Sequence, residues 1–165
     1  MASERTLVVI KTDGVARNLV GKILDRYESA GLKITEMKML IAGASLVKQH
    51  YPDSMAEQLG QKAVKSGAKI DNLKEHGKKV LGWLRAYISS GPVVAMVIEG
   101  EGAIQRVRDI TGYTDPKEAA KGTVRGDFGT DSILQATKEG RVVYNLIHAS
   151  GNKEEAEREI RLWFG

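Results

Sequence analysis

The stretch LKITEMKMLIA (residues 32–42) alternates apolar and polar side chains, which is the pattern of a β-strand with one buried face. The runs TLVVIK (6–11) and VVAMVIE (93–99) are apolar almost throughout, and NLIHA (145–149) predicts a fourth strand. Strands of an all-parallel sheet are apolar on both faces, so the alternating second strand favours a mixed or antiparallel sheet.

Helical patterns separate the predicted strands. They cover residues 17–30, 45–51, 80–88, 103–110 and 152–164, with Ser45 as an N-cap and with Asn152 and Glu155 as a capping box. The order β-α-β-α-β-α-β-α predicts a ferredoxin-like α/β sandwich, in which helices cover one face of a mainly antiparallel four-stranded sheet. Two polar segments lack periodicity, and we expect an inserted excursion near 53–79 and a long irregular loop near 111–141.

The composition excludes several classes of protein. The chain is 42% hydrophobic and 28% charged, without any apolar run near the length of a membrane span or a signal peptide core. It has no cysteine, which excludes disulfides and thiolate metal sites. We therefore expect a soluble, cytoplasmic protein of one domain, residues 1–165. The net charge of +4 favours anionic partners, although a solvated basic surface explains it equally well.

Known nucleotide-binding and metal-binding motifs are absent from the sequence. The nearest match to a P-loop, GVARNLVGKI (14–23), has six residues between its glycines and ends in Ile23 where a hydroxyl is needed. EGEG (99–102) lacks the third glycine of a dinucleotide fingerprint. The three histidines are scattered along the chain, so we expect no metal site built on them.

A histidine and a glutamate near the C-terminus form the first candidate site. In the last predicted helix, Ala156, Ile160 and Trp163 make an apolar stripe, and Glu159 lies on the same side. A carboxylate in that position is costly unless it is hydrogen-bonded. If it pairs with His148, it fixes the tautomer of the imidazole and leaves the other ring nitrogen free to attack a phosphate. The alternative is that Glu159 tilts to the edge of the stripe and is solvated.

Basic residues at strand ends and in the long loop form the second candidate site. Lys11 ends the first predicted strand, and Arg108 and Arg125 lie in or beside the loop with Thr114 between them. Functional residues are often found at such positions, and a phosphate site requires fixed positive charge. Solvated surface cations are the alternative interpretation.

Four segments, in order along the chain, resemble the nucleoside diphosphate kinase family. They are ERTLVVIKTDGVARNLVGKIL (4–24), GPVVAMVIEG (91–100), KGTVRGDF (121–128), and NLIHASG (145–151) with AEREIRLWF (156–164). The resemblance leaves out about residues 53–78 and 129–140. It implies one domain of this family across residues 1–165. The implied reaction is transfer of the terminal phosphate of a nucleoside triphosphate to a nucleoside diphosphate, with Mg²⁺ bound to the nucleotide phosphates.

The resemblance also implies roles for individual residues. His148 would be the nucleophile of a ping-pong mechanism through a phosphohistidine, with Glu159 and Ser150 holding its imidazole. Lys11 and Tyr51 would meet the phosphates near the transferred group. The other implied nucleotide contacts are Arg108, Thr114 and Arg125 at the phosphates, Asn145 with Lys11 at the sugar hydroxyls, and Val80 and Val142 beside the base. Since none of these reads the base by a specific hydrogen bond, we expect broad base tolerance.

Some positions depart from the pattern of the family. Thr12 and Lys121 replace prolines, and Val80 stands where the family has a base-stacking aromatic residue. Trp83 is the alternative candidate for contact with the base. Strict alternation would also place Asn145 and His148 on opposite faces of one strand. Both can reach one nucleotide only if the regular strand starts after Asn145.

The expected partners are nucleoside di- and triphosphates and further copies of the chain, as a hexamer, tetramer or dimer. We expect no membrane partner, and nucleic acid only as a secondary ligand. Two alternatives remain at this stage: a catalytically inactive member of the family, and a ferredoxin-like nucleic-acid-binding module. The second requires aromatic residues exposed on the sheet, for which Tyr144 is the one candidate.

Overall fold

The order of the strands, and of the helices predicted between them, is the observed one, with α4 (Ala56–Lys65) added between α3 (Ala44–His50) and α5 (Leu73–Ile88). The computed structural model describes residues 2–165, and its elements are β1 (Ser3–Ile10), α1 (Thr12–Ala16), α2 (Val20–Ser29), β2 (Lys33–Leu40), α3 (Ala44–His50), a 3₁₀ turn (Asp53–Met55), α4 (Ala56–Lys65), α5 (Leu73–Ile88), β3 (Val93–Glu101), α6 (Ala103–Thr111), α7 (Val124–Phe128), α8 (Ile133–Glu139), β4 (Ile147–Ala149) and α9 (Lys153–Phe164). None of the helices in this part of the chain is long and apolar enough to cross a bilayer.

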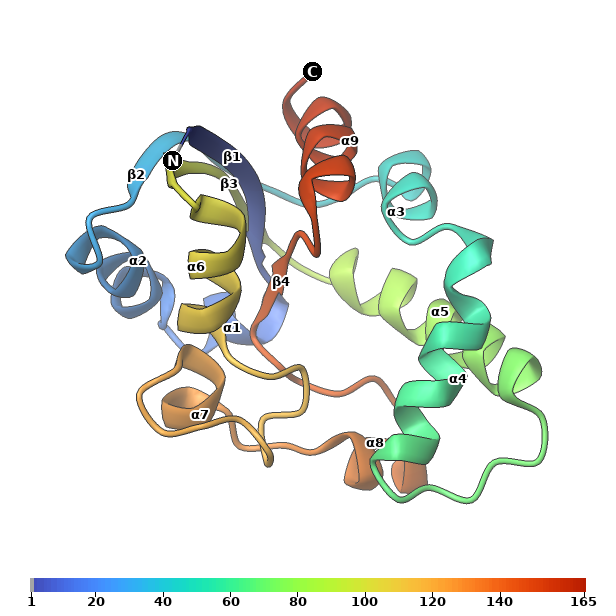
Figure 1. Cartoon of the computed structure of the whole chain (residues 1–165). Helices are drawn as coiled ribbons and strands as arrows, with labels where there is room; N and C mark the ends of the chain where they lie inside the picture. Colours follow the sequence, from blue (N-terminus) through green and yellow to red (C-terminus); the bar gives the residue numbers. More distant parts are fainter. Residues whose placement is uncertain (1) are drawn as a thin grey trace.

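The four strands form one sheet in the order β2-β3-β1-β4, and each neighbouring pair is antiparallel (Figure 1). This confirms the ferredoxin-like, four-stranded sheet that the alternating second strand predicts. The short β4 pairs with the end of β1, so that His148 lies opposite Val9. Lys11 follows two residues later, which brings the two candidate sites of the sequence to the same edge of the sheet.

Helices cover both faces of the sheet, so the expectation of a single covered face is wrong. One core contains Val8, Ile10 and Met96 under α2 and α6, and the other contains Leu7 and Val9 under α3, α5 and α9. Figure 1 shows α2 and α6 on one side of β1 and β3, and α3, α5 and α9 on the other. The cause is the continuous apolar sequence of these two central strands, which presents apolar side chains to both faces.

The second strand is an edge strand with an apolar outer surface. Its register with β3 shifts between Ile34 and Glu36, as in a β-bulge. Met37 and Met39 are 54% and 61% exposed, as is Ile41 directly after the strand at 66%. None of the residues of β2 is buried, so the buried face that the alternation predicts is not formed within residues 2–165. The exposed part of this strand carries large apolar side chains as well as charged ones.

The segment near 53–79 is not an irregular excursion. It folds as α4 and the first turns of α5, which pack against each other as a helical hairpin. The buried side of α4 consists of Ala56, Gly60 and Ala63, at the spacing of one helix face. Small residues allow two helices to approach closely, but they do not produce the large apolar periodicity on which the prediction relied.

Two smaller expectations are also wrong. The loop near 111–141 contains two short helices, α7 and α8. Gly43, and not Ser45, is the N-cap of α3, since the helix starts at Ala44. The predicted cap of the last helix is confirmed, because the Asn152 side chain accepts a hydrogen bond from the Glu155 backbone N–H.

Candidate active site

A cleft of about 1120 Å³ lies where β4, the loop before it, and helices α4, α5 and α8 meet. Its volume is sufficient for a nucleotide. Nine of the residues that sequence analysis selects line this cleft, namely Lys11, Tyr51, Val80, Arg108, Thr114, Arg125, Val142, Asn145 and His148. Glu159 and Ser150 are buried directly behind His148. The structure therefore gathers the two candidate sites into one.

The Glu159 carboxylate holds the His148 imidazole from the buried side. His148 Nε2 lies 3.0 Å from Glu159 Oε1 and 2.8 Å from Oε2, and Ser150 Oγ donates a 2.6 Å hydrogen bond to Oε1. Ser150 in turn contacts the backbone of Leu7 on β1. Glu159 is 2% exposed, so it does not tilt to solvent, and the paired interpretation of the sequence is confirmed as geometry.

This carboxylate fixes the tautomer of His148. Burial would raise the pKa of Glu159, but the charge and the hydrogen bond of His148 outweigh it and hold the pKa at about 2. An ionised carboxylate only accepts hydrogen bonds, so Nε2 must carry the proton. The lone pair of the neutral ring is then on Nδ1, for which residues 2–165 provide no hydrogen bond. A nitrogen in this state, on a residue that lines the cleft, is suited to nucleophilic attack.

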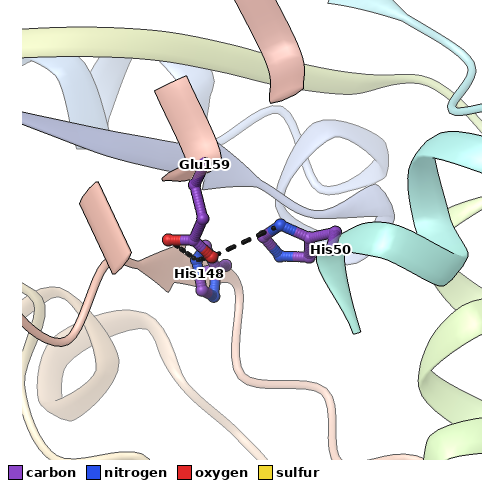
Figure 2. Close-up of side chains that lie close together, drawn as sticks. All are labelled: His50, His148 and Glu159. Carbon is purple, nitrogen blue, oxygen red and sulfur yellow. Dashed lines mark hydrogen bonds and ion pairs between the residues drawn. The ribbon is translucent and has the colours of Figure 1, made fainter. Parts of the chain in front are cut away.

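A second histidine, which sequence reasoning missed, lies beside this pair. His50 is buried, its ring centroid is 4.3 Å from that of His148, and its Nδ1 accepts a 3.1 Å hydrogen bond from Trp163 Nε1. Figure 2 shows the Glu159 carboxylate between the two imidazoles, with His50 Nδ1 3.4 Å from Oε2. Burial and the charge of His148 keep the pKa of His50 well below its ordinary value, so its ring is neutral.

His50 and His148 therefore correct the view that the histidines are scattered. Their nitrogens and the Glu159 carboxylate lie within 4.8 Å of one another, which is close enough for a shared metal ion. However, Trp163 already donates to His50 Nδ1, and Glu159 accepts from His148 Nε2. A metal ion would have to displace both hydrogen bonds. The absence of a metal ligand among the histidines stays a prediction.

The loop before β4 presents Asn145 to the same cleft as His148. Leu146 has a φ of 70°, in the left-handed region, and its N–H donates to Asp13 Oδ2. The regular strand begins at Ile147, after this turn. Asn145 can therefore face the same cleft as His148, because it lies before the regular strand and is not bound by its alternation. Its Oδ1 accepts a 2.9 Å hydrogen bond from Lys11 Nζ.

Lys11 and Arg125 are buried cations in the cleft wall. Burial, followed by the charge of Arg125, lowers the pKa of Lys11 to about 7. Burial also lowers the pKa of Arg125 to about 10. The Arg125 guanidinium donates to the carbonyls of Gly112, Asn145 and Ile147, so it fixes the loop that carries the site. Arg108 is exposed at the end of α6 and has no such anchor within residues 2–165.

The remaining predicted residues form the less polar part of the cleft. Tyr51 is buried, with its ring centroid 6.5 Å from that of His148, and burial followed by the charge of Glu159 raises its pKa. Val80 and Val142 line the cleft, and so does Trp83, one turn of α5 beyond Val80. Val80 and Trp83 therefore both line the cleft, whereas the sequence left open which of the two contacts the base.

Comparison with known proteins agrees with this geometry. The sequence model of the nucleoside diphosphate kinase family matches residues 4–69 and 72–165. The chain belongs to the nucleoside diphosphate kinase family. A nucleoside diphosphate kinase of Pyrobaculum aerophilum is 45% identical over 176 aligned positions, which cover 99% of this chain and 96% of that protein.

Two solved structures of the family are also similar to this chain. The crystal structure of an NDP kinase from Pyrobaculum aerophilum has a TM-score of 0.93 and 41% identity, covering 99% of this chain and 97% of the other. A nucleoside diphosphate kinase from Borrelia burgdorferi, solved as a transition-state mimic with bound vanadate and ADP, has a TM-score of 0.86 and 38% identity. It covers 99% of this chain and 88% of its own. The inserted α4–α5 hairpin therefore lies within the aligned length of both.

Proposed function

We propose that this protein transfers the terminal phosphate of a nucleoside triphosphate to a nucleoside diphosphate through a phosphohistidine at His148. The observation that carries the proposal is the state of that side chain. Its Nε2 proton is held by a buried carboxylate, and its Nδ1 is left to a cleft lined by cations. Membership of the family agrees with this reaction.

The reaction divides into two displacements at the same phosphorus. In the first, the Nδ1 lone pair forms a P–N bond while the bond from the γ-phosphorus to the β,γ-bridging oxygen breaks, and the diphosphate leaves with that electron pair. In the second, a terminal oxygen of another nucleoside diphosphate attacks the phosphorus and the P–N bond breaks. Glu159 remains ionised throughout and stabilises the positive charge that develops on the imidazole. One site serves donor and acceptor in turn, which is a ping-pong mechanism.

The cations of the cleft would bind the phosphates. Lys11 Nζ and the free guanidinium of Arg108 stabilise the charge on the transferred group and on the leaving diphosphate. Thr114 and Arg125 contact further phosphate oxygens, and Asn145 binds the sugar hydroxyls. Tyr51 approaches the phosphates from the α3 side of His148.

Mg²⁺ would arrive bound to the nucleotide. Lys11, Arg108 and Arg125 line the cleft together with His148, and these cations fit an ion whose ligands are phosphate oxygens and water better than a cage of protein carboxylates. When bound, the ion neutralises part of the phosphate charge. Lys11, Arg108 and Arg125 neutralise the remainder.

The apolar residues at the other end of the cleft support broad base tolerance. Val80, Trp83 and Val142 contact a base by its faces, which all bases share. The nucleic-acid-binding alternative is not favoured, because its one candidate aromatic residue, Tyr144, precedes β4 and packs on Tyr87 instead of the sheet surface. An inactive scaffold is not favoured either, since the residues required for chemistry are present and in contact.

The exposed edge strand supports a homo-oligomer as part of this proposal. Met37 and Met39 on β2 and Ile41 directly after it present apolar surface, and the outer edge of β2 is not paired with another strand of residues 2–165. An edge of this kind is normally covered or charged. A second copy of the chain is the occupant we propose, in the cytoplasm, and sedimentation of the wild-type protein and of Met39→Lys would test it.

The function is tested by intact-mass analysis after incubation with ATP and Mg²⁺, followed by a chase with GDP. We expect one added phosphate, labile to acid, which disappears as GTP forms. His148→Ala should form no adduct and should lose at least about 10³-fold in transfer rate, while it keeps its fold and binds ADP. Transfer by His148→Ala at the wild-type rate would refute the role of His148.

A further inference from the structure

The inserted helix α4 contributes one cation to the cleft that neither the sequence motifs nor the family resemblance assign. Lys62 lies at the end of the second turn of α4, within the segment 53–78 that the resemblance leaves out. Its side chain is half-buried and lines the same cleft as Lys11, Arg108, Arg125 and His148. Lysine side chains are usually solvated, so a half-buried one in a cleft wall requires a physical reason.

The position of Lys62 is fixed by close packing of the inserted hairpin. A Cβ atom on Gly60 would lie 2.1 Å from the Leu73 carbonyl oxygen, and one on Gly77 would lie 1.5 Å from the Ala56 carbonyl oxygen. The backbones of α4 and α5 are therefore in contact at two points, and no larger residue fits at either. Figure 1 shows α4 and α5 side by side. Because Gly60 is two residues before Lys62, this contact fixes the part of α4 that carries the lysine.

The charge of Lys62 is unbalanced in the described part of the chain, residues 2–165. Burial, followed by the charges of Arg125 and Arg108, lowers its pKa. Its ammonium makes no hydrogen bond or ion pair with another group of residues 2–165. Glu155 is the acidic group whose charge acts on it, but one oxygen of that carboxylate accepts from the Gly151 N–H. A half-buried, unpaired cation among other cations destabilises the free protein.

The neighbouring lysine of the same helix is in a different state. Lys65 is exposed, and its ammonium lies over the Tyr113 ring, 5.7 Å from the centroid. Lys62 lacks such a partner, and its charge adds to those of Lys11, Arg108 and Arg125. A group of several negative charges would balance all four, and a nucleoside di- or triphosphate is an anion of that kind.

We propose that Lys62 binds the terminal phosphates of the bound nucleotide from the α4 wall of the cleft. This inference rests on the nucleotide site proposed above. It makes the inserted hairpin part of the substrate site and gives the cleft a cation on the wall formed by α4. Lys62 contributes to binding of the phosphate chain, whereas the chemistry stays with His148.

Two opposite changes distinguish this role from a structural one. Replacing Lys62 by methionine keeps the apolar stem and removes the unpaired charge, so the free protein should melt at a higher temperature. The same change should weaken ADP binding about tenfold, because one charge-assisted hydrogen bond to phosphate is lost. A residue that only packs the hairpin would not raise stability when it is replaced.

The experiment measures melting temperature without ligand and dissociation constants for ADP and AMP by calorimetry. The variants are Lys62→Met, Lys62→Arg and, as a matched control, Lys74→Met, an exposed lysine of α5 in the same hairpin. We expect Lys62→Met to lose more affinity for ADP than for AMP, Lys62→Arg to recover most of it, and Lys74→Met to match the wild type.

The outcomes distinguish failure of the role of Lys62 from failure of the proposed function. The role of Lys62 would be overturned if Lys62→Met weakened binding of ADP and AMP equally, or if it bound ADP as tightly as Lys74→Met does. The proposed function would then still stand, provided that the wild-type protein transfers phosphate. A wild-type protein that forms no phosphohistidine but shows the Lys62-dependent loss of ADP affinity would refute the function and keep the binding role. A wild type that does not bind ADP would overturn both.

Discussion

The two walls of the cleft are built in opposite ways. On the β4 wall the polar groups that hold the nucleophile are paired, and His148 Nδ1 is left to the cleft: Glu159 binds His148 and Ser150, Lys11 binds Asn145, and Arg125 binds three backbone carbonyls. On the α4 wall the backbones of two helices are in contact through glycines, and Lys62 has no polar partner. The first wall is complete without a ligand, and the second requires one to balance its charge.

The two walls therefore have different tasks: the β4 wall holds the nucleophile rigidly, and the α4 wall contributes to the affinity for nucleotide. A nucleophile must be held in one tautomer and one orientation before the substrate arrives, since reorganisation during the reaction would raise the barrier. A phosphate-binding cation gains most when its charge is unpaired in the free protein and paired in the complex. We therefore expect substitution of Glu159, which holds the nucleophile, to change the rate of phosphorylation, and substitutions in the α4 wall to change nucleotide affinity.

The largest effect after loss of His148 itself is expected for Glu159→Gln. The amide keeps the size of the side chain but has no negative charge, and it offers one acceptor oxygen to both Ser150 and His148. We expect the single-turnover rate of phosphorylation by ATP to fall about 10- to 100-fold. The dissociation constant for ADP should stay within twofold, roughly, because Glu159 does not line the cleft.

The control for that variant is Glu157→Gln, an exposed residue of the same helix α9. It should behave as the wild type in both measurements. A Glu159→Gln protein with a normal rate would show that the carboxylate only fills space. If Glu159→Gln had a normal rate at saturating ATP but bound ADP much more weakly, the β4 wall would contribute to affinity and not to rate, which contradicts the proposed difference between the two walls.

The next effect is expected for Gly77→Ala in the hairpin. Its methyl group would lie 1.5 Å from the Ala56 carbonyl oxygen, so α4 must move away from α5. We expect the free energy of unfolding to fall by about 1–3 kcal/mol. Because α4 carries Lys62, ADP binding should weaken as well, while phosphorylation of His148 at saturating ATP persists. Thermal melts and calorimetry measure the first two quantities, and intact mass the third.

Gly82→Ala is the matched control in the same helix. A Cβ at that exposed position meets nothing within 4 Å, so alanine should stabilise α5 by up to about 1 kcal/mol through its higher helix propensity. Equal stability of the two alanine variants would contradict the close contact of the hairpin. Loss of the phosphohistidine in Gly77→Ala would show that the hairpin also holds the chemistry in place.

The β4 wall could be predicted from the sequence, whereas the α4 wall could not. Large apolar residues at regular spacing identified the four strands and α9, and a carboxylate on the apolar stripe of that helix pointed to His148. The α4 helix buries Ala56, Gly60 and Ala63, whose small side chains give little periodic signal. Only their spacing, together with good helix formers around them, could have indicated a helix there.

Contacts between segments that are distant in the chain could not be predicted either, because no local pattern specifies them. His50 and His148 are far apart in the chain, and Trp163 connects to His50 only because α3 packs beside α9. The turn that sets Asn145 against Lys11 depends on Leu146 in a left-handed conformation, which is rare for leucine. The Asp13 side chain stabilises it by accepting from the Leu146 N–H, a contact that no local pattern specifies.

The smallest effect concerns the protonation of Lys11. Burial and Arg125 hold its pKa at about 7 in the free protein, so most of the side chain is neutral at pH 8. Bound phosphates favour the ammonium and raise this pKa, and ADP binding at pH 8 should therefore take up most of one proton. The uptake should vanish well below pH 7, where Lys11 is already charged. Calorimetry in buffers of different ionisation enthalpy measures it, with Lys11→Met as the variant that should lose the uptake.

The lowered pKa of Lys11 also makes the free energy of unfolding depend on pH. In the unfolded chain Lys11 has the ordinary value of 10.5, so between about pH 7 and 10.5 the unfolded state binds more protons than the folded one. The contribution of Lys11 to the free energy of unfolding must then rise with pH across this window. Without nucleotide, Lys11→Met should flatten that rise, and Lys74→Met should not. A wild type whose stability does not depend on Lys11 in this range would show that Asn145 holds the ammonium charged, and that the β4 wall is complete at every pH.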